Sequence, residues 1–307
     1  MGTPAAAVSS LSALLEAQHD VAAVYTQPDK PAGRGNKLHA SAVKEYAVLR
    51  GLPVFQPVKI RTAEALADFR LHQADVAVVV AYGRILPETF LNAFPRGAIN
   101  VHFSLLPKYR GAAPVNWAIV NGEKVTGVTT MMMDVGLDTG DILRQSSTEI
   151  GGDENALELM ARLSDTGAQL LVETLRDLDS IPRKPQDHAA MSLAPIMKKD
   201  DGLVDFSRTA SDVNNRVRGF QPFPTAFTYF GGKRLTIWRS SVRIDGEHLQ
   251  TASEGAIVVA KGDELVICCG EGTFLAVHEL QLEGKRRMNV RDFNNGVRPV
   301  VGTLLGQ

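Results

Sequence analysis

Apolar and polar positions alternate between helix-like and strand-like spacing along the first third of the chain. The segments with three- and four-residue spacing, typical of amphipathic helices, are 5–18, 41–51 and 62–71. The short β-rich or wholly apolar runs are 21–25, 52–55 and 75–81. The last of these is uninterrupted, as in a strand buried on both faces of a parallel sheet. This alternation predicts a doubly wound α/β domain, in which ligands bind beyond the carboxyl ends of the strands.

The pattern changes after residue 181. Pro182, Pro185 and Pro195 interrupt any periodicity there, which predicts a linker. A helix-like segment then precedes short β-rich runs separated by glycine-containing turns, the pattern of a small barrel. Those runs are 226–230, 234–241, 255–260, 265–269 and 274–282. We therefore expect an α/β domain over 1–181, a linker over 182–202 and a β-barrel over 203–307.

Composition adds bounds to this picture. The chain has 307 residues, enough for two domains, and its 33 basic and 34 acidic residues give a net charge of −1. Any nucleic-acid contact must therefore come from local basic patches. The only cysteines, Cys268 and Cys269, are adjacent, which suits a reducing compartment better than a disulfide framework or a metal site. No apolar run approaches ~20 residues and no signal peptide is evident, so we expect a cytoplasmic protein.

The most informative stretch runs from residue 97 to residue 114. An apolar run ends there in polar residues, followed by proline and glycine, which indicates a strand leading into a functional loop. Side chains alternate along a strand, so Asn100 and His102 would share one face while Ile99 and Val101 pack behind them. Each residue taken alone has an ordinary structural interpretation, as a turn-forming asparagine or a buried core histidine.

A second candidate loop follows the strand expected at 125–132. Its residues 134–141 contain three carboxylates and two glycines, the composition of a tight loop that can present a side chain. Spacing alone leaves a catalytic role and a simple turn about equally supported for Asp138.

Together these motifs resemble the folate-dependent formyltransferases. The matching residues are Asn100-x-His102-x-Ser104-Leu105-Leu106-Pro107, Arg110-Gly111 and Leu137-Asp138-Thr139-Gly140. The resemblance implies a Rossmann-like N-terminal domain, a C-terminal OB-like β-barrel and 10-formyltetrahydrofolate as co-substrate, without a metal. It also implies catalytic roles for Asn100, His102 and Asp138. The folate-binding residues that it implies are Ser104, Leu105, Leu106, Pro107, Tyr82, Gly83 and Ile85.

The proline- and glycine-rich segment 26–37 resembles the loop with which the tRNA-modifying branch of this family grips its tRNA. It points to methionyl initiator tRNA as partner, with Arg34, Lys37 and Lys30 as contacts, and Lys199 in the linker as a further one. Further candidate phosphate contacts in the barrel are Lys233, Arg234, Arg239, Lys285, Arg286, Arg287 and Arg291. We expect a monomer.

Two positions depart from the family pattern. Gly2-Thr3-Pro4 resembles the turn after the family's first strand, so that strand is expected to be missing and the sequence to be truncated or to begin at a wrongly chosen start. Phe103 stands where the family usually has a small residue, so it is an open question whether the substrate has room there.

The proposed chemistry is attack of an amine on a formyl carbonyl without an acyl-enzyme. Asn100 would stabilise the oxyanion, His102 would handle protons and Asp138 would orient the imidazole. Three other functions stay open: formylation of an amino sugar nucleotide or other small amine, hydrolysis of formyl-folate, and RNA binding without catalysis.

Overall fold

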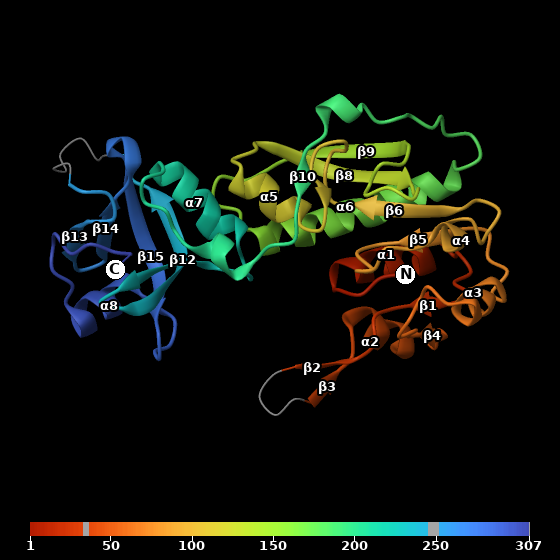
Figure 1. Cartoon of the computed structure of the whole chain (residues 1–307), viewed down its shortest axis with the longest axis horizontal. Helices are drawn as coiled ribbons and strands as arrows, with labels where there is room; N and C mark the ends of the chain where they lie inside the picture. The colour runs from red at the N-terminus through yellow and green to blue at the C-terminus, as the bar shows by residue number, and fades with distance from the viewer. Residues whose placement is uncertain (33–36, 245–251, 307) are drawn as a thin grey trace. The chain divides into compact units, whose positions relative to one another are not determined.

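The computed structural model of the chain describes residues 1–32, 37–244 and 252–306. It divides into two compact units (Figure 1). Unit 1 comprises Met1–Pro114, Val125–Thr148 and Met160–Pro195, and unit 2 comprises Val115–Lys124, Glu149–Leu159 and Ile196–Gln307.

Unit 1 is built on parallel and mixed β-structure flanked by helices. Its strands are β1 (Val24–Tyr25), β2 (Lys30–Ala32), β3 (Lys37–His39), β4 (Val54–Phe55), β5 (Ala77–Val79), β6 (Ala98–His102), β7 (Arg110–Gly111), β8 (Val125–Met132), β9 (Ile142–Glu149) and β10 (Leu193–Ala194). The helices that begin in it are α1 (Ala6–Glu16), α2 (Ala42–Leu49), α3 (Ala63–Arg70), α4 (Glu88–Leu91) and α5 (Pro114–Val120), and η1 (His188–Ala190) is a 3₁₀ turn. Helix α6 (Ala156–Arg176) begins in unit 2 and continues through unit 1.

The main sheet of unit 1 has the order β5-β6-β8-β9. Strands β5 and β6 are parallel, but β6 and β8 are antiparallel. The predicted α/β class is therefore present, and the sheet is mixed rather than wholly parallel. Every residue of β6 is buried, because the sheet continues on both of its edges and side chains cover both of its faces.

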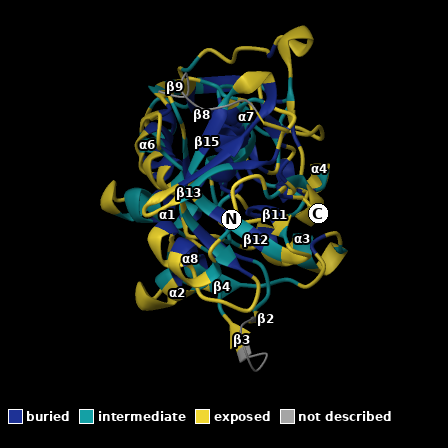
Figure 2. Cartoon of the chain, turned by 90° about the vertical axis from the view of Figure 1, so that its left-hand side faces the viewer, coloured by how far each residue is buried: buried dark blue, intermediate teal, exposed yellow. Residues whose placement is uncertain are grey.

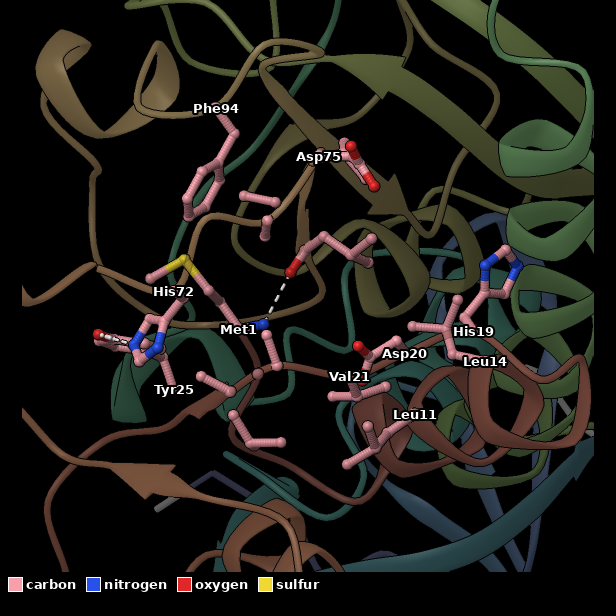
Figure 3. Close-up of a pocket in the computed structure, with 18 of the residues that line it drawn as sticks. Met1, Leu11, Leu14, His19, Asp20, Val21, Tyr25, His72, Asp75 and Phe94 are labelled. Atoms are coloured by element: carbon pink, nitrogen blue, oxygen red, sulfur yellow. Dashed lines mark hydrogen bonds between the residues drawn. The ribbon is translucent and has the colours of Figure 1, made fainter. Parts of the chain in front are cut away.

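A two-residue stretch at Met1 and Gly2 joins the small β1–β4 sheet to the main sheet. The Gly2 amide donates to the Tyr25 carbonyl (2.9 Å), and the Val80 amide donates to the Met1 carbonyl (2.9 Å). The Met1 amine donates to the Val78 carbonyl (2.7 Å). A cavity of about 350 Å³ continues from this stretch between β1 and β5, with Leu11 among its apolar lining residues (Figure 3).

Phe103 and Val101 lie on the face of the main sheet that α6 covers. A Cβ built on Gly167 of α6 would lie 2.9 Å from Val101 Cγ1 and 3.5 Å from Phe103 Cε1. Because side chains alternate, Asn100 and His102 point to the other face. Phe103 therefore leaves the polar face of β6 unobstructed.

The segment predicted as a linker begins as part of unit 1. Lys184 and Ile142 exchange both backbone hydrogen bonds, and β10 pairs in parallel with β7. Contacts therefore assign residues up to Pro195 to unit 1, where the sequence placed a boundary at residue 181. The proline spacing did not reveal this pairing, because two-residue strands carry no periodicity.

Unit 2 contains a largely antiparallel sheet of order β11-β12-β15-β14-β13, with β16 paired to β15. Its strands are β11 (Ala226–Phe230), β12 (Lys233–Val242), β13 (Ile257–Lys261), β14 (Glu264–Cys268), β15 (Phe274–Leu282) and β16 (Met288–Asn289). Its helical elements are α7 (Ala210–Gly219), α8 (Val290–Val297) and the 3₁₀ turns η2 (Lys199–Gly202) and η4 (Gly270–Gly272). Figure 2 shows β15 largely buried, as expected for a strand with neighbours on both edges.

A closed barrel is not formed by the strand pairings of the residues described. The C-terminal tail instead reaches both outer strands. Leu305 donates its amide to the Gly255 carbonyl next to β13, and Gly306 donates to the Tyr229 carbonyl in β11. The β-rich character of this unit is confirmed, and the OB-like closure stays a prediction.

Candidate functional site

The polar face of β6 presents Asn100 and His102 on alternate residues. Asn100 pairs in register with Val79 and Met131, and His102 with Thr129. Asn100 is only 8% exposed, and within the described part of the chain its carboxamide makes no hydrogen bond. Its polar atoms are not among the enclosed side-chain atoms that lack a partner, so they still reach solvent. Its N–H groups are therefore available to an incoming acceptor.

The hydrogen bonds of His102 fix its ring orientation. Nε2 lies 2.8 Å from the carbonyl oxygen of Tyr109. A carbonyl oxygen only accepts, so Nε2 carries a proton in both the neutral and the charged ring. Nδ1 faces Asp138, at 3.7 Å from Oδ2. Nδ1 is thus the atom of this ring that can gain or lose a proton.

Asp138 reaches His102 from the loop between β8 and β9. Its Oδ2 also accepts the Gly111 amide (2.8 Å). Gly111 has φ +122°, and a Cβ there would lie 2.7 Å from the Ala194 carbonyl oxygen, so only glycine fits between Asp138 and β10. The structure therefore places two of the residues predicted as catalytic, Asn100 and His102, on one strand, and brings the third, Asp138, to His102 from a single loop.

The loop that carries Asp138 is braced internally. Asp134 Oδ1 accepts the Gly136 amide (3.0 Å) and the Thr139 hydroxyl (2.6 Å). From outside the loop, the Gln186 amide donates to the carbonyls of Asp138 and Gly140. Sequence reasoning missed Gln186, because it lies in the proline-rich segment interpreted as a linker and no motif marks it.

The predicted folate residues after β6 are partly structural. Ser104 is fully buried, and its hydroxyl donates to the Lys108 carbonyl (2.7 Å). Leu106 is buried as well, while Leu105 and Pro107 are half-buried. Only the latter two side chains remain accessible to a ligand.

The predicted folate residues after β5 likewise include one buried side chain and two exposed residues. The Tyr82 side chain is 2% exposed within the core of unit 1, and its carbonyl accepts Thr3 Oγ1 and Gln27 Nε2. Gly83 and Ile85 are exposed. Ile85 borders a pocket of about 430 Å³ whose charged lining residues are Lys59, Arg61 and Arg84.

The predicted tRNA contacts fall in both units of the chain. Lys30 is exposed on β2, in the β2–β3 hairpin that projects from unit 1 in Figures 1 and 2. Lys37 lies in β3, and Arg34 falls outside the described residues. Lys199 is exposed at the start of η2 in unit 2.

The basic residues of the second unit fall into two groups. Some already bind other side chains: the Arg234 guanidinium lies 3.8 Å from the Phe227 ring centroid, Arg287 pairs with Glu279, and Arg291 pairs with Asp263. The exposed residues without such a pairing are Lys233, Arg239, Lys285 and Arg286. Phosphate binding would draw on this second group first.

The described residues show neither a metal-binding cluster nor a membrane-spanning helix. They contain no group of three or more histidine, cysteine, aspartate or glutamate side chains placed to hold a metal. None of their helices is both long and apolar enough to cross a membrane.

Comparisons with known proteins show the family to which the chain belongs. The formyl transferase family matches residues 1–175, and the formyl transferase C-terminal domain matches residues 196–298. A methionyl-tRNA formyltransferase of Acidobacterium capsulatum is 49% identical, over 99% of this chain and 98% of its own length. Another methionyl-tRNA formyltransferase, from Acetivibrio thermocellus, is 45% identical over 100% of this chain and 98% of its own length.

Among solved structures, an N-formyltransferase from Helicobacter canadensis, in complex with folinic acid and dTDP-3-aminofucose, has a similar fold. Its TM-score is 0.65 at 20% identity, covering 90% of this chain and 96% of the other. With both domain matches and full-length relatives near half identity, the chain belongs to the formyl transferase family.

Proposed function

We propose that this protein transfers the formyl group of 10-formyltetrahydrofolate to the α-amine of methionine esterified to initiator tRNA. The observation that carries the chemistry is one polar strand face with an unpartnered carboxamide, Asn100, and an imidazole, His102, 3.7 Å from the Asp138 carboxylate. The acceptor is argued from the full-length relatives, which are named methionyl-tRNA formyltransferase.

Each of the three side chains has one task in this reaction. Asn100 donates an N–H to the formyl oxygen as charge develops on it, an interaction that contributes ~3–4 kcal/mol in comparable sites. His102 accepts the proton of the attacking amine at Nδ1, because Nε2 is already committed to the Tyr109 carbonyl. The imidazolium that results lies beside Asp138, whose carboxylate stabilises it. His102 then returns a proton to the departing nitrogen.

Ser104 takes no covalent part in this scheme. Its hydroxyl is buried and donates to the Lys108 carbonyl. Direct transfer from one nitrogen to the other is therefore the simplest path.

The folate is proposed to bind between the two loops that follow β5 and β6. Leu105, Pro107 and Ile85 offer accessible apolar surface there. The pocket beside Ile85 carries Lys59, Arg61 and Arg84, a charge that suits the carboxylates of a folate. The tRNA is proposed to contact Arg34, Lys37 and Lys30 in the segment 26–37, and Lys199 in unit 2. A monomeric state and a cytoplasmic location stay predictions.

The experiment compares acceptors with the purified protein and 10-formyltetrahydrofolate. Methionyl initiator tRNA, an amino sugar nucleotide and no acceptor are incubated in parallel, and folate absorbance is followed. We expect turnover that requires the charged tRNA. Product from the sugar nucleotide but not from the tRNA would overturn the proposal, as would folate turnover independent of an acceptor. A protein inert with every acceptor would favour RNA binding without catalysis.

Two classes of variant separate chemistry from tRNA recognition. His102→Ala and Asp138→Asn should each lower kcat at least about 10²-fold, because both groups act on the transferred proton. Arg34→Ala should instead raise KM for the tRNA and leave the folate KM unchanged. His39→Ala, on the exposed β3, is a matched control for the loss of an imidazole.

A further inference from the structure

The backbone conformation of Asp138 requires external support. Asp138 has φ +52°, in the left-handed region that non-glycine residues seldom occupy. Its side chain is held at one point, by the Gly111 amide on Oδ2. Within the loop, the side-chain hydrogen bonds of Asp134 go to Gly136 and Thr139 and not to Asp138 itself.

Gln186 supplies a second point of support, on the backbone. Its Nε2 donates to the Asp138 carbonyl (2.9 Å) and to the Gly140 carbonyl (2.7 Å). These carbonyls belong to the peptide groups 138–139 and 140–141, so one amide group holds two peptide groups of the loop, one of which adjoins Asp138. Carbonyl oxygens only accept, so the NH₂ end of the amide must face them.

The other end of the Gln186 amide is fixed by Arg110. Arg110 Nε and Nη2 donate to Gln186 Oε1 at 3.1 Å and 2.7 Å. A guanidinium only donates, which again determines the amide orientation. Both residues are buried, at 6% exposure for Gln186 and 4% for Arg110, so water does not compete for these bonds. All the hydrogen-bonding capacity of the glutamine amide is used.

The chain around Gln186 is itself fastened on both sides. Lys184 pairs with Ile142 at the start of β9, and β10 pairs with β7. Arg110 and Gly111, the two residues of β7, thus hold Asp138 by two routes. Gly111 binds its carboxylate directly, and Arg110 orients the glutamine that binds its carbonyl.

We propose that Gln186 is a positioning residue that sets the place of the Asp138 carboxylate beside His102 through hydrogen bonds to the Asp138 and Gly140 carbonyls. This inference rests on the proposed function for its kinetic consequence. Its structural content is independent of which acceptor the protein uses. Gln186 touches neither His102 nor Asn100, so it acts through the loop.

Two substitutions test different ends of the amide. Gln186→Glu keeps the size of the side chain and an acceptor for Arg110, but it removes both N–H donors to the loop carbonyls. Gln186→Met removes the N–H donors to the loop carbonyls and also the oxygen that accepts from Arg110. Asp187→Ala is the matched control, because Asp187 is the next residue, is exposed, and has one capping bond, to the Ala189 amide.

The expected result is a fall in kcat of about 10–100-fold for both Gln186 variants, the penalty of a misplacement near 1 Å. KM for folate and for the acceptor should change less than about threefold, since neither substrate is bound by Gln186. In NMR, the Gly111 amide should exchange with solvent at least about tenfold faster than in the wild type, because its acceptor, the Asp138 carboxylate, is displaced. Asp187→Ala should match the wild type in all three measurements.

Retention of kcat and of Gly111 protection in Gln186→Glu would overturn the inference. A defect confined to Gln186→Met would also overturn it, since the residue would then serve only to satisfy Arg110. If the wild type formylates no methionyl-tRNA, the proposed function fails, and faster Gly111 exchange in both variants still supports the positioning role.

Discussion

At the residue scale, Asn100 is a polar side chain on a buried central strand. Its carboxamide makes no hydrogen bond among the described residues, and its polar atoms are not among the enclosed ones that lack a partner, so they reach solvent. An accessible amide on a rigid strand suits the donor role that we propose for Asn100.

Asn100→Asp tests the donor directly. The substitution keeps the shape of the side chain, removes both N–H groups and adds negative charge where the oxyanion develops. We expect kcat to fall by about 10²–10³-fold or more, with the folate KM nearly unchanged. Asn92→Asp, at an exposed position after α4, is the control and should retain full activity. Equal rates for the two variants would remove Asn100 from the mechanism.

At the scale of the elements, the site depends on how closely β8 and β9 pack beside β6. The loop that carries Asp138 connects the end of β8 to the start of β9, so the two strands determine its position. Gly127 in β8 lies against β9, where a Cβ would come 2.1 Å from the Ser146 carbonyl oxygen. A backbone atom cannot move away as a flexible side chain can, so the strand spacing requires glycine.

Gly127→Ala should therefore lower the free energy of unfolding by about 2–4 kcal/mol, in the upper range for overpacking. Denaturant unfolding followed by circular dichroism measures it. Gly152→Ala is the matched control, because a Cβ at Gly152 meets no atom within 4 Å and its φ is not positive. Similar stability for the two variants would contradict the close packing of β8 and β9.

At the scale of the whole molecule, the stretch at Met1 and Gly2 links the two sheets of unit 1. Burial lowers the pKa of the Met1 amine to about 5, from 8.0. The side chain of Met1 is half-buried, but the amine itself is enclosed and donates to the Val78 carbonyl (Figure 3). The amine is therefore neutral in the folded protein at pH 7, and it lies at the edge of a cavity of about 350 Å³.

In a chain that begins at Met1, this burial makes the free energy of unfolding depend on pH. Between pH 8 and pH 5 the unfolded chain binds the proton and the folded chain does not, so the free energy of unfolding falls as the pH is lowered through that range. At ~1.4 kcal/mol per pKa unit the full loss is about 4 kcal/mol, and stability is greatest above pH 8. Urea unfolding at a series of pH values measures the slope.

The comparison is a chain lengthened before Met1 by a few apolar, β-prone residues. A peptide N–H then replaces the amine, which should abolish this part of the pH dependence. Side chains that enter the cavity should add about 2–4 kcal/mol of stability. Identical pH slopes for the two chains would show that the Met1 amine is not buried as described.

The sequence by itself determined the class of the fold and the chemistry of the strand face. Period-two alternation placed Asn100 and His102 on one face of a strand, because side-chain alternation is a local, steric property. Asp138 was singled out by the resemblance to the formyltransferases, since the composition of its loop fits a simple turn equally well. The two-unit division was also evident, although its boundary moved from residue 181 to Pro195.

Only the tertiary structure decided which residues support that site. It set the distance between His102 and Asp138 and the burial of Ser104 and Tyr82. It also linked Gln186 to the Asp138 loop. Each of these features depends on contacts between segments that are distant in the chain. Contacts of this kind depend on strands with no periodic signal, such as β7 and β10, which pair although they are far apart in the sequence. No local pattern of apolar and polar residues encodes them.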